Sequence, residues 1–84
     1  MIPMAKNEVI EILKSFIFLL QKEGISVEKA YLYGSYLSGS ATSDSDIDIL
    51  VVTKNGNDDY LAGKIWQLTR KISTRIEPYI VGSD

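Results

Sequence analysis

The most constraining feature of this sequence is the short connection between two apolar runs. The first run, residues 29–33, ends at Gly34, and the second, residues 46–52, begins with Asp46 after only eleven intervening residues. Both runs have the composition of strands, and a parallel crossover normally needs a dozen or more residues. We therefore expect the two strands to pair antiparallel, with Gly34 beside Asp46.

A third run, residues 75–81, follows the second after 22 residues. This connection is long enough for a helical crossover, so the third strand should lie parallel to the second. Glu77 is then level with Asp46 and Asp48, at one end of the sheet. Pro78 lacks a backbone N–H, which predicts an edge position or a bulge for this strand.

Two longer segments have helical periodicity. Residues 5–23 form one apolar stripe and stop at Gly24, and a second helix starts at Asp58 or Asp59. The stripes consist of Val9, Leu13, Phe16 and Leu20 in the first helix and of Leu61, Ile65, Leu68 and Ile72 in the second. We predict an α+β fold, a small mixed β-sheet with helices packed against it in the order α-β-α-β-α-β, as a single domain over residues 1–84.

The first helix is unusually apolar on a second side, where Ile10, Ile12, Ile17 and Leu19 widen its stripe. Two interpretations remain open. This side either thickens the intramolecular core or forms a homo- or hetero-oligomer contact through the helix.

Composition excludes several classes of function. Nine basic and eleven acidic residues give a net charge of −2 without a run of like charge, so we expect no nucleic-acid partner. The absence of cysteine and histidine excludes disulfides, thiolate zinc sites and imidazole bases. No apolar stretch approaches the length of about 18 residues that a membrane span needs, and the N-terminus does not resemble a secretion signal. These features predict a soluble, cytoplasmic protein with no membrane partner.

The second strand carries two acidic residues on one face. Asp46 and Asp48 are separated by two positions and point the same way, about 7 Å apart, whereas the later residues of that face are apolar. This pattern predicts a strand buried on both sides whose first residues emerge into a cleft. Two carboxylates at this distance repel by about 2 kcal/mol, and no lysine or arginine lies between Lys29 and Lys54. With oxygen ligands only, Mg²⁺ or Mn²⁺ is the expected counter-charge.

Gly34 and Ser35 provide a second element of the candidate site. Glycine permits a sharp turn and close approach to a ligand, and Ser35 is expected to open a short helical segment whose free N–H groups can hold a phosphate. A Gly-Ser pair alone is usually only a turn. Its coupling to Asp-x-Asp eleven residues later makes the pattern specific.

Together these segments resemble a known superfamily. The pair Gly34-Ser35, the run Ser45-Asp46-Ile47-Asp48-Ile49-Leu50-Val51 and the later pair Ile76-Glu77 are similar to the signature of the DNA polymerase β-type nucleotidyltransferases. Within that superfamily the chain most resembles the minimal nucleotidyltransferases (MNT), antitoxins that accompany HEPN-domain toxins.

The resemblance implies roles for individual residues. Asp46, Asp48 and Glu77 would bind the metal ions and form the catalytic centre, with Glu77 assisting the incoming hydroxyl. Gly34, Ser35 and Ser45 would bind the nucleotide. The implied reaction transfers AMP from ATP, with Mg²⁺ or Mn²⁺, to a hydroxyl such as a tyrosine of a HEPN-type partner.

One departure from the family pattern keeps an alternative open. Many relatives have an arginine directly before the glycine that corresponds to Gly39, whereas this chain has the uncharged Ser38. Loss of that charge would weaken binding of a triphosphate. A non-catalytic antitoxin that neutralises its partner by complex formation is therefore the second hypothesis. A stand-alone enzyme for a small-molecule acceptor ranks last, because 84 residues leave little room for an acceptor domain.

Overall fold

The computed structural model describes residues 5–42, 45–54 and 56–83. Its elements alternate as the sequence predicts, and each predicted boundary lies within two residues of the observed one. They are α1 (Lys6–Lys22), β1 (Val27–Tyr33), α2 (Ser35–Ser38), β2 (Ile47–Thr53), α3 (Asp59–Ile72) and β3 (Ile76–Gly82). The predicted α+β class and element order are confirmed.

The sheet has three strands in the order β1-β2-β3, with β2 in the centre. β1 pairs antiparallel with β2, and β3 pairs parallel with β2, as the two connection lengths predict. Pro78 lies in β3, at an edge of the described sheet, and the register with β2 continues through it without a bulge. An edge strand tolerates proline because only one of its sides takes part in the ladder.

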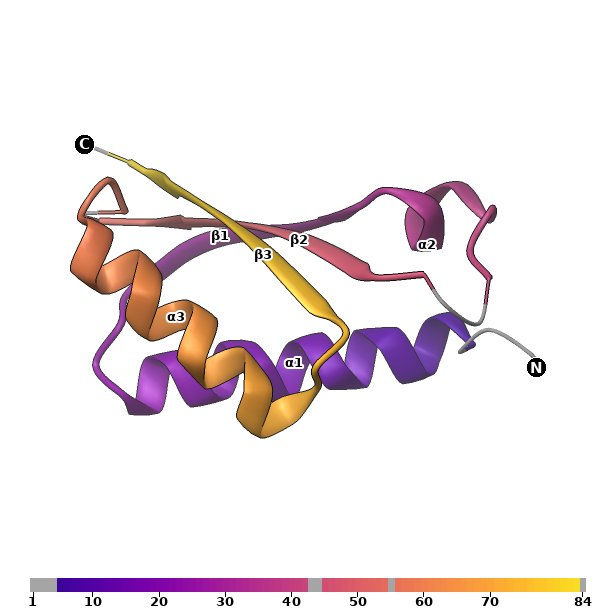
Figure 1. Cartoon of the computed structure of the whole chain (residues 1–84), viewed down its shortest axis with the longest axis horizontal. Coiled ribbons are helices and arrows are strands. Elements are labelled where there is room, and N and C mark those ends of the chain that lie inside the picture. The colour runs from indigo at the N-terminus through magenta and orange to yellow at the C-terminus, as the bar shows by residue number, and fades with distance from the viewer. Residues whose placement is uncertain (1–4, 43–44, 55, 84) are drawn as a thin grey trace.

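The helices cover one face of the sheet. Figure 1 shows α1 and α3 on the same side of the three strands. Burial alternates strictly along β2, where Ile47, Ile49, Val51 and Thr53 are buried towards the helices. Leu50 and Val52, on the other face, are only half-buried. The prediction that β2 is buried on both sides is therefore wrong, because no described element packs on the second face.

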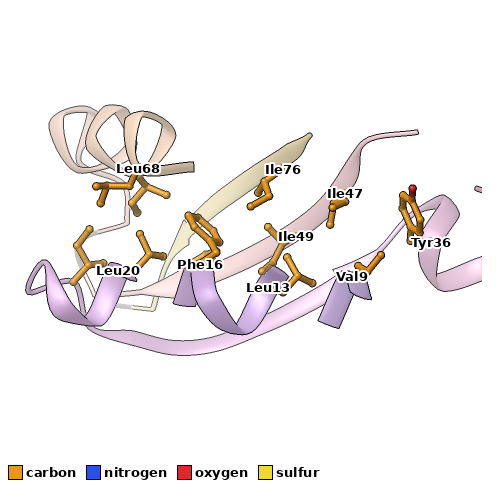
Figure 2. Close-up of a cluster of buried hydrophobic side chains, with 12 residues drawn as sticks. Val9, Leu13, Phe16, Leu20, Tyr36, Ile47, Ile49, Leu68 and Ile76 are labelled. Atoms are coloured by element: carbon orange, nitrogen blue, oxygen red, sulfur yellow. The ribbon is translucent and has the colours of Figure 1, made fainter. Parts of the chain in front are cut away.

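The core lies between this layer of helices and the sheet. Val9, Leu13, Phe16 and Leu20 lie on one face of α1, at the three- and four-residue spacing that a helix needs to bury a single stripe. Figure 2 shows these side chains directed towards those of β2 and β3. Phe16 and Leu20 are fully buried.

A side-chain cap marks the start of α3, the helix that connects β2 to β3. The carboxylate of Asp58 accepts a hydrogen bond from the N–H of Tyr60 at 2.9 Å, which caps the helix. Ile65 and Leu68 bury its inner side. The helix then ends at Ile72, from which the chain returns as β3 beside β2.

The second apolar side of α1 lines a groove between the helix and β1. This α1/β1 groove has a volume of about 480 Å³, and Ile10, Ile17, Phe18, Ala30 and Leu32 line much of it. Phe18 is 68% exposed. Ile12, Ile17 and Leu19 are partly buried and pack against the core, whereas Ile10 and Phe18 are exposed, so this side of α1 both thickens the core and leaves an apolar edge outside it. None of the described helices is long and apolar enough to cross a membrane.

Phe16 and Phe18 test which side of α1 is buried, because Phe16 lies in the core and Phe18 is exposed. Phe16→Ala should lower the free energy of unfolding by about 3–5 kcal/mol, because it leaves a cavity in the core. Phe18→Ala removes an exposed ring and should change it by less than about 0.5 kcal/mol. Urea denaturation of both variants measures the difference, and similar losses for the two would contradict the assignment.

Candidate functional site

The register of the sheet brings three polar side chains into one row. Asp48 lies opposite Tyr33 in the antiparallel ladder and opposite Glu77 in the parallel one. Partners across a ladder project to the same face. Because Ile47 and Ile49 point to the helices, this row lies on the uncovered face. The predicted placement of Glu77 beside Asp48 is confirmed.

Gly34, expected beside Asp46, is instead in close contact with Asp48. Its backbone has φ 78° and ψ −153°, a region open almost only to glycine. A Cβ at this position would lie 2.2 Å from Oδ2 of Asp48, which is far inside van der Waals contact. Both the backbone conformation and the neighbouring carboxylate therefore require a glycine here.

Ser35 begins the short helix α2, as the sequence predicts. The N–H groups of Leu37 and Ser38 both donate to the carbonyl of Gly34, at 3.1 and 3.0 Å, so only the N–H groups at the very start of α2 can face a ligand or water. The hydroxyl of Ser38, at the position where many relatives carry arginine, lies 2.8 Å from that of Ser40. This end of the turn thus carries hydroxyls in place of a positive charge.

Asp46 lies directly before β2, at the end of a segment that Arg75 holds. The guanidinium of Arg75 donates to the carbonyl of Ser45 and, at 3.5 Å, to the hydroxyl of Tyr36. The N–H of Ile47 donates to the carbonyl of Arg75 at 2.8 Å. These bonds tie both neighbours of Asp46 to the start of β3, so Arg75 is a positioning residue that the sequence pattern did not reveal.

The side chain of Ser45 is engaged in the same segment. Its hydroxyl accepts a hydrogen bond from the N–H of Thr42 at 2.8 Å, and its own N–H donates to the carbonyl of Thr42 at 3.1 Å. These two bonds join Ser45 to Thr42 directly before Asp46. Its contact with a nucleotide remains a prediction.

Two tyrosines accompany the carboxylates, and neither was among the predicted site residues. The hydroxyl of Tyr79 donates to Oε1 of Glu77 at 3.1 Å. The rings of Tyr33 and Tyr79 pack with their centroids 5.6 Å apart. The period of two in β3 was the available signal, since it places Tyr79 on the face of Glu77.

Acidic side chains lie close together at this site, and they raise the pKa of neighbouring groups. Partial burial, and then the charge of Asp46, raise the pKa of Asp48 above its ordinary value. The hydrogen bond to Glu77 and the charge of Glu77 raise the pKa of Tyr79. In the part of the chain that the structure describes, the one ion pair is that between Glu11 and Lys14, so Asp46, Asp48 and Glu77 form no ion pair with a basic side chain.

Comparison with known proteins identifies this arrangement. A family model for the nucleotidyltransferase domain matches residues 9–82. The chain belongs to the nucleotidyltransferase family. Searches of curated proteins and of solved structures gave no match. Membership assigns the chain to the transferases, with a nucleotide as substrate, and confirms the predicted superfamily.

The residues of this nucleotidyltransferase fit a divalent metal only in part. Asp46 and Asp48 offer hard oxygen ligands, and a cation would offset the partial burial and the charge of Asp46, which together raise the pKa of Asp48. However, no three acidic side chains within residues 5–42, 45–54 and 56–83 are grouped closely enough to hold an ion. Glu77 would have to exchange its contact with Tyr79 for one towards Asp48. Its role as a ligand therefore remains a prediction.

Substitution of Gly34 tests the close approach to Asp48. Gly34→Ala should cost more than the roughly 1–2 kcal/mol expected for a left-handed position, because its Cβ also displaces the carboxylate. Gly39→Ala is the matched control, since Gly39 has φ 82° and open space around it. In an Asp48→Ala background the cost of Gly34→Ala should shrink. Equal costs in both backgrounds, measured by urea denaturation, would show that the contact is irrelevant.

The raised pKa of Asp48 predicts a pH dependence of stability. The fold disfavours the charged form of Asp48, so this residue lowers the free energy of unfolding as pH rises from its ordinary pKa of 3.8 through the raised value. Asp48→Asn should therefore be more stable than the native chain at neutral pH, and the gap should close in acid. Asp46→Asn should act in the same direction but less strongly, because it removes only the smaller of the two causes that raise the pKa of Asp48. Denaturation across a pH series measures this, and a gap that is independent of pH would contradict the assignment.

Proposed function

We propose that residues 1–84 act as a single minimal nucleotidyltransferase domain that transfers AMP from ATP to a tyrosine hydroxyl of a HEPN-type partner. In this proposal the chain is a cytoplasmic antitoxin that inactivates its partner by covalent modification. The observation that carries the proposal is the row of Asp48 and Glu77 beside Gly34, on the uncovered sheet face, where no described basic side chain forms an ion pair with them. The match to the nucleotidyltransferase family supports it further.

In this proposal the position of each residue determines whether it binds phosphate, binds metal or accepts a proton. Gly34 and Ser35 would hold the phosphates through backbone N–H groups, because glycine lets the chain approach closely and α2 opens there. Asp46 and Asp48 would hold Mg²⁺ or Mn²⁺, which supplies alignment and neutralises charge on the phosphates. Glu77 would accept the proton of the attacking hydroxyl.

The proposed reaction accounts for every bond formed and broken, for the leaving group and for the proton. The acceptor oxygen forms a bond to the α-phosphorus of ATP, and the bond from this phosphorus to the bridging oxygen breaks. Pyrophosphate leaves with the electron pair, and the acceptor proton passes to the carboxylate of Glu77. Such transfers depend mainly on alignment and charge stabilisation, so a small scaffold can perform them.

A test combines the chain with ATP labelled on its α-phosphate, Mg²⁺ and a purified HEPN-type protein. Label should appear on a tyrosine of the partner. Asp48→Asn should slow transfer by at least about a hundredfold, because this change removes a cation ligand at the reacting phosphate. Glu11→Gln, on the exposed side of α1, is a control that should leave the rate unchanged. Absence of label with both Mg²⁺ and Mn²⁺ would refute the catalytic proposal.

The second candidate function is neutralisation by complex formation alone. The α1/β1 groove favours it, because Phe18 and its neighbours present an apolar surface to a partner. The uncharged Ser38 agrees with reduced affinity for a triphosphate. Under this hypothesis Asp46→Asn leaves neutralisation of the toxin in cells intact, whereas Phe18→Asp abolishes it. The catalytic hypothesis requires that Asp46→Asn also fails to neutralise.

A further inference from the structure

The hydroxyl of Tyr79 lies beside the carboxylate to which the proposed function gives proton transfer. It donates a hydrogen bond of 3.1 Å to Oε1 of Glu77, the carboxylate assigned above to proton transfer. Glu77 is in register with Asp48, so the phenol lies at the same end of the sheet as the phosphate-binding turn at Gly34. Tyr79 is 47% exposed, which leaves its ring accessible from the uncovered face.

We propose that Tyr79 is itself a nucleotide acceptor, so that the chain modifies its own tyrosine. This inference rests on the proposed function, because it uses the same nucleotide and the same carboxylates. It differs in the acceptor, which lies within the chain and requires no partner protein.

The surroundings of the other tyrosines single out Tyr79. Tyr36 is buried, and its hydroxyl accepts from Arg75. Tyr60 begins α3, in the helical layer, and is 81% exposed. Tyr31 shares the uncovered face but lies opposite Leu50. Among the described residues, Tyr79 is the tyrosine whose hydroxyl donates to a carboxylate.

Tyr33 would hold the acceptor ring in place. It lies opposite Asp48 in the ladder, and its ring packs against that of Tyr79 with centroids 5.6 Å apart and planes at 58°. Tilted aromatic pairs of this kind are favourable and restrict the rotation of both rings. A restricted phenol within hydrogen-bond reach of its base has the alignment that group transfer exploits.

The proposed step balances in the same way as transfer to a partner. The phenolic oxygen of Tyr79 forms a bond to the α-phosphorus of ATP while the bond to the bridging oxygen breaks. Pyrophosphate leaves, and the phenolic proton passes to Glu77. The product is a phosphodiester on Tyr79. The phenolic oxygen itself has no further proton to give, so it forms this bond only once.

The experiment uses the full chain with ATP labelled on its α-phosphate, Mg²⁺ and no other protein. Intact-mass analysis should show the gain of a single AMP, and peptide mapping should place it on Tyr79. Tyr79→Phe should lose the label, whereas Tyr60→Phe should keep it. The rate per chain should not change with protein concentration, because the acceptor is intramolecular. Label on another residue, or a rate that rises with concentration, would overturn the inference.

A binding measurement separates this inference from the proposed function. Calorimetry with the α,β-methylene analogue of ATP, which cannot transfer AMP, should give similar affinities for the native chain and for Tyr79→Phe. If both bind, and label reaches the HEPN-type protein but never Tyr79, the inference fails and the proposed function stands. If neither the native chain nor Tyr79→Phe binds the analogue and no label appears on any protein, the inference and the proposed function both fail. Thermal unfolding of Tyr79→Phe should match the native chain, which shows that loss of label is not loss of fold.

Discussion

Asp48 lies where the two ladders of the sheet meet, with Tyr33 across the antiparallel pair and Glu77 across the parallel pair. The side-chain period of a strand is two, so a slip of one residue in either ladder would move a neighbour of Asp48 to the opposite face. The apolar residues that alternate with the acids prevent such a slip, because Ile47, Ile49 and Val51 must stay in the core. The packing of the helices thus fixes the register, and the register assembles the site.

The same alternation explains why the site lies on the uncovered face. Burial of an unpaired carboxylate is costly, and no described basic side chain pairs with Asp46, Asp48 or Glu77. Two helices suffice to cover one face of a sheet of this size, and that face is apolar along β2. The acids are left on the other face, where water or a cation can reach them and where a nucleotide and an acceptor can approach together.

Backbone connectivity was predictable from the sequence, whereas the contacts of the site side chains were not. Connection lengths are read directly from the chain, and they correctly predict both strand pairings and the register of Asp48 with Glu77. Which face the helices cover depends on tertiary packing, so the half-burial of Leu50 was missed. The bonds of Arg75 to Ser45 and of Tyr79 to Glu77 depend on rotamers, and no spacing rule encodes them.

Oε1 of Glu77 accepts a hydrogen bond from Tyr79, so a partner's hydroxyl that uses this oxygen competes with the phenol. A hydrogen bond to a charged group contributes roughly 1.5–3 kcal/mol, and an exposed one less, so replacing Tyr79 on Oε1 has a modest cost. A cation held with Asp48 would also draw Glu77 away from the phenol. The affinity of an external acceptor therefore includes the free energy of breaking the contact between Tyr79 and Glu77. Removal of the Tyr79 hydroxyl eliminates that competition, so a chain without it should present Glu77 more readily to a partner than the native chain does.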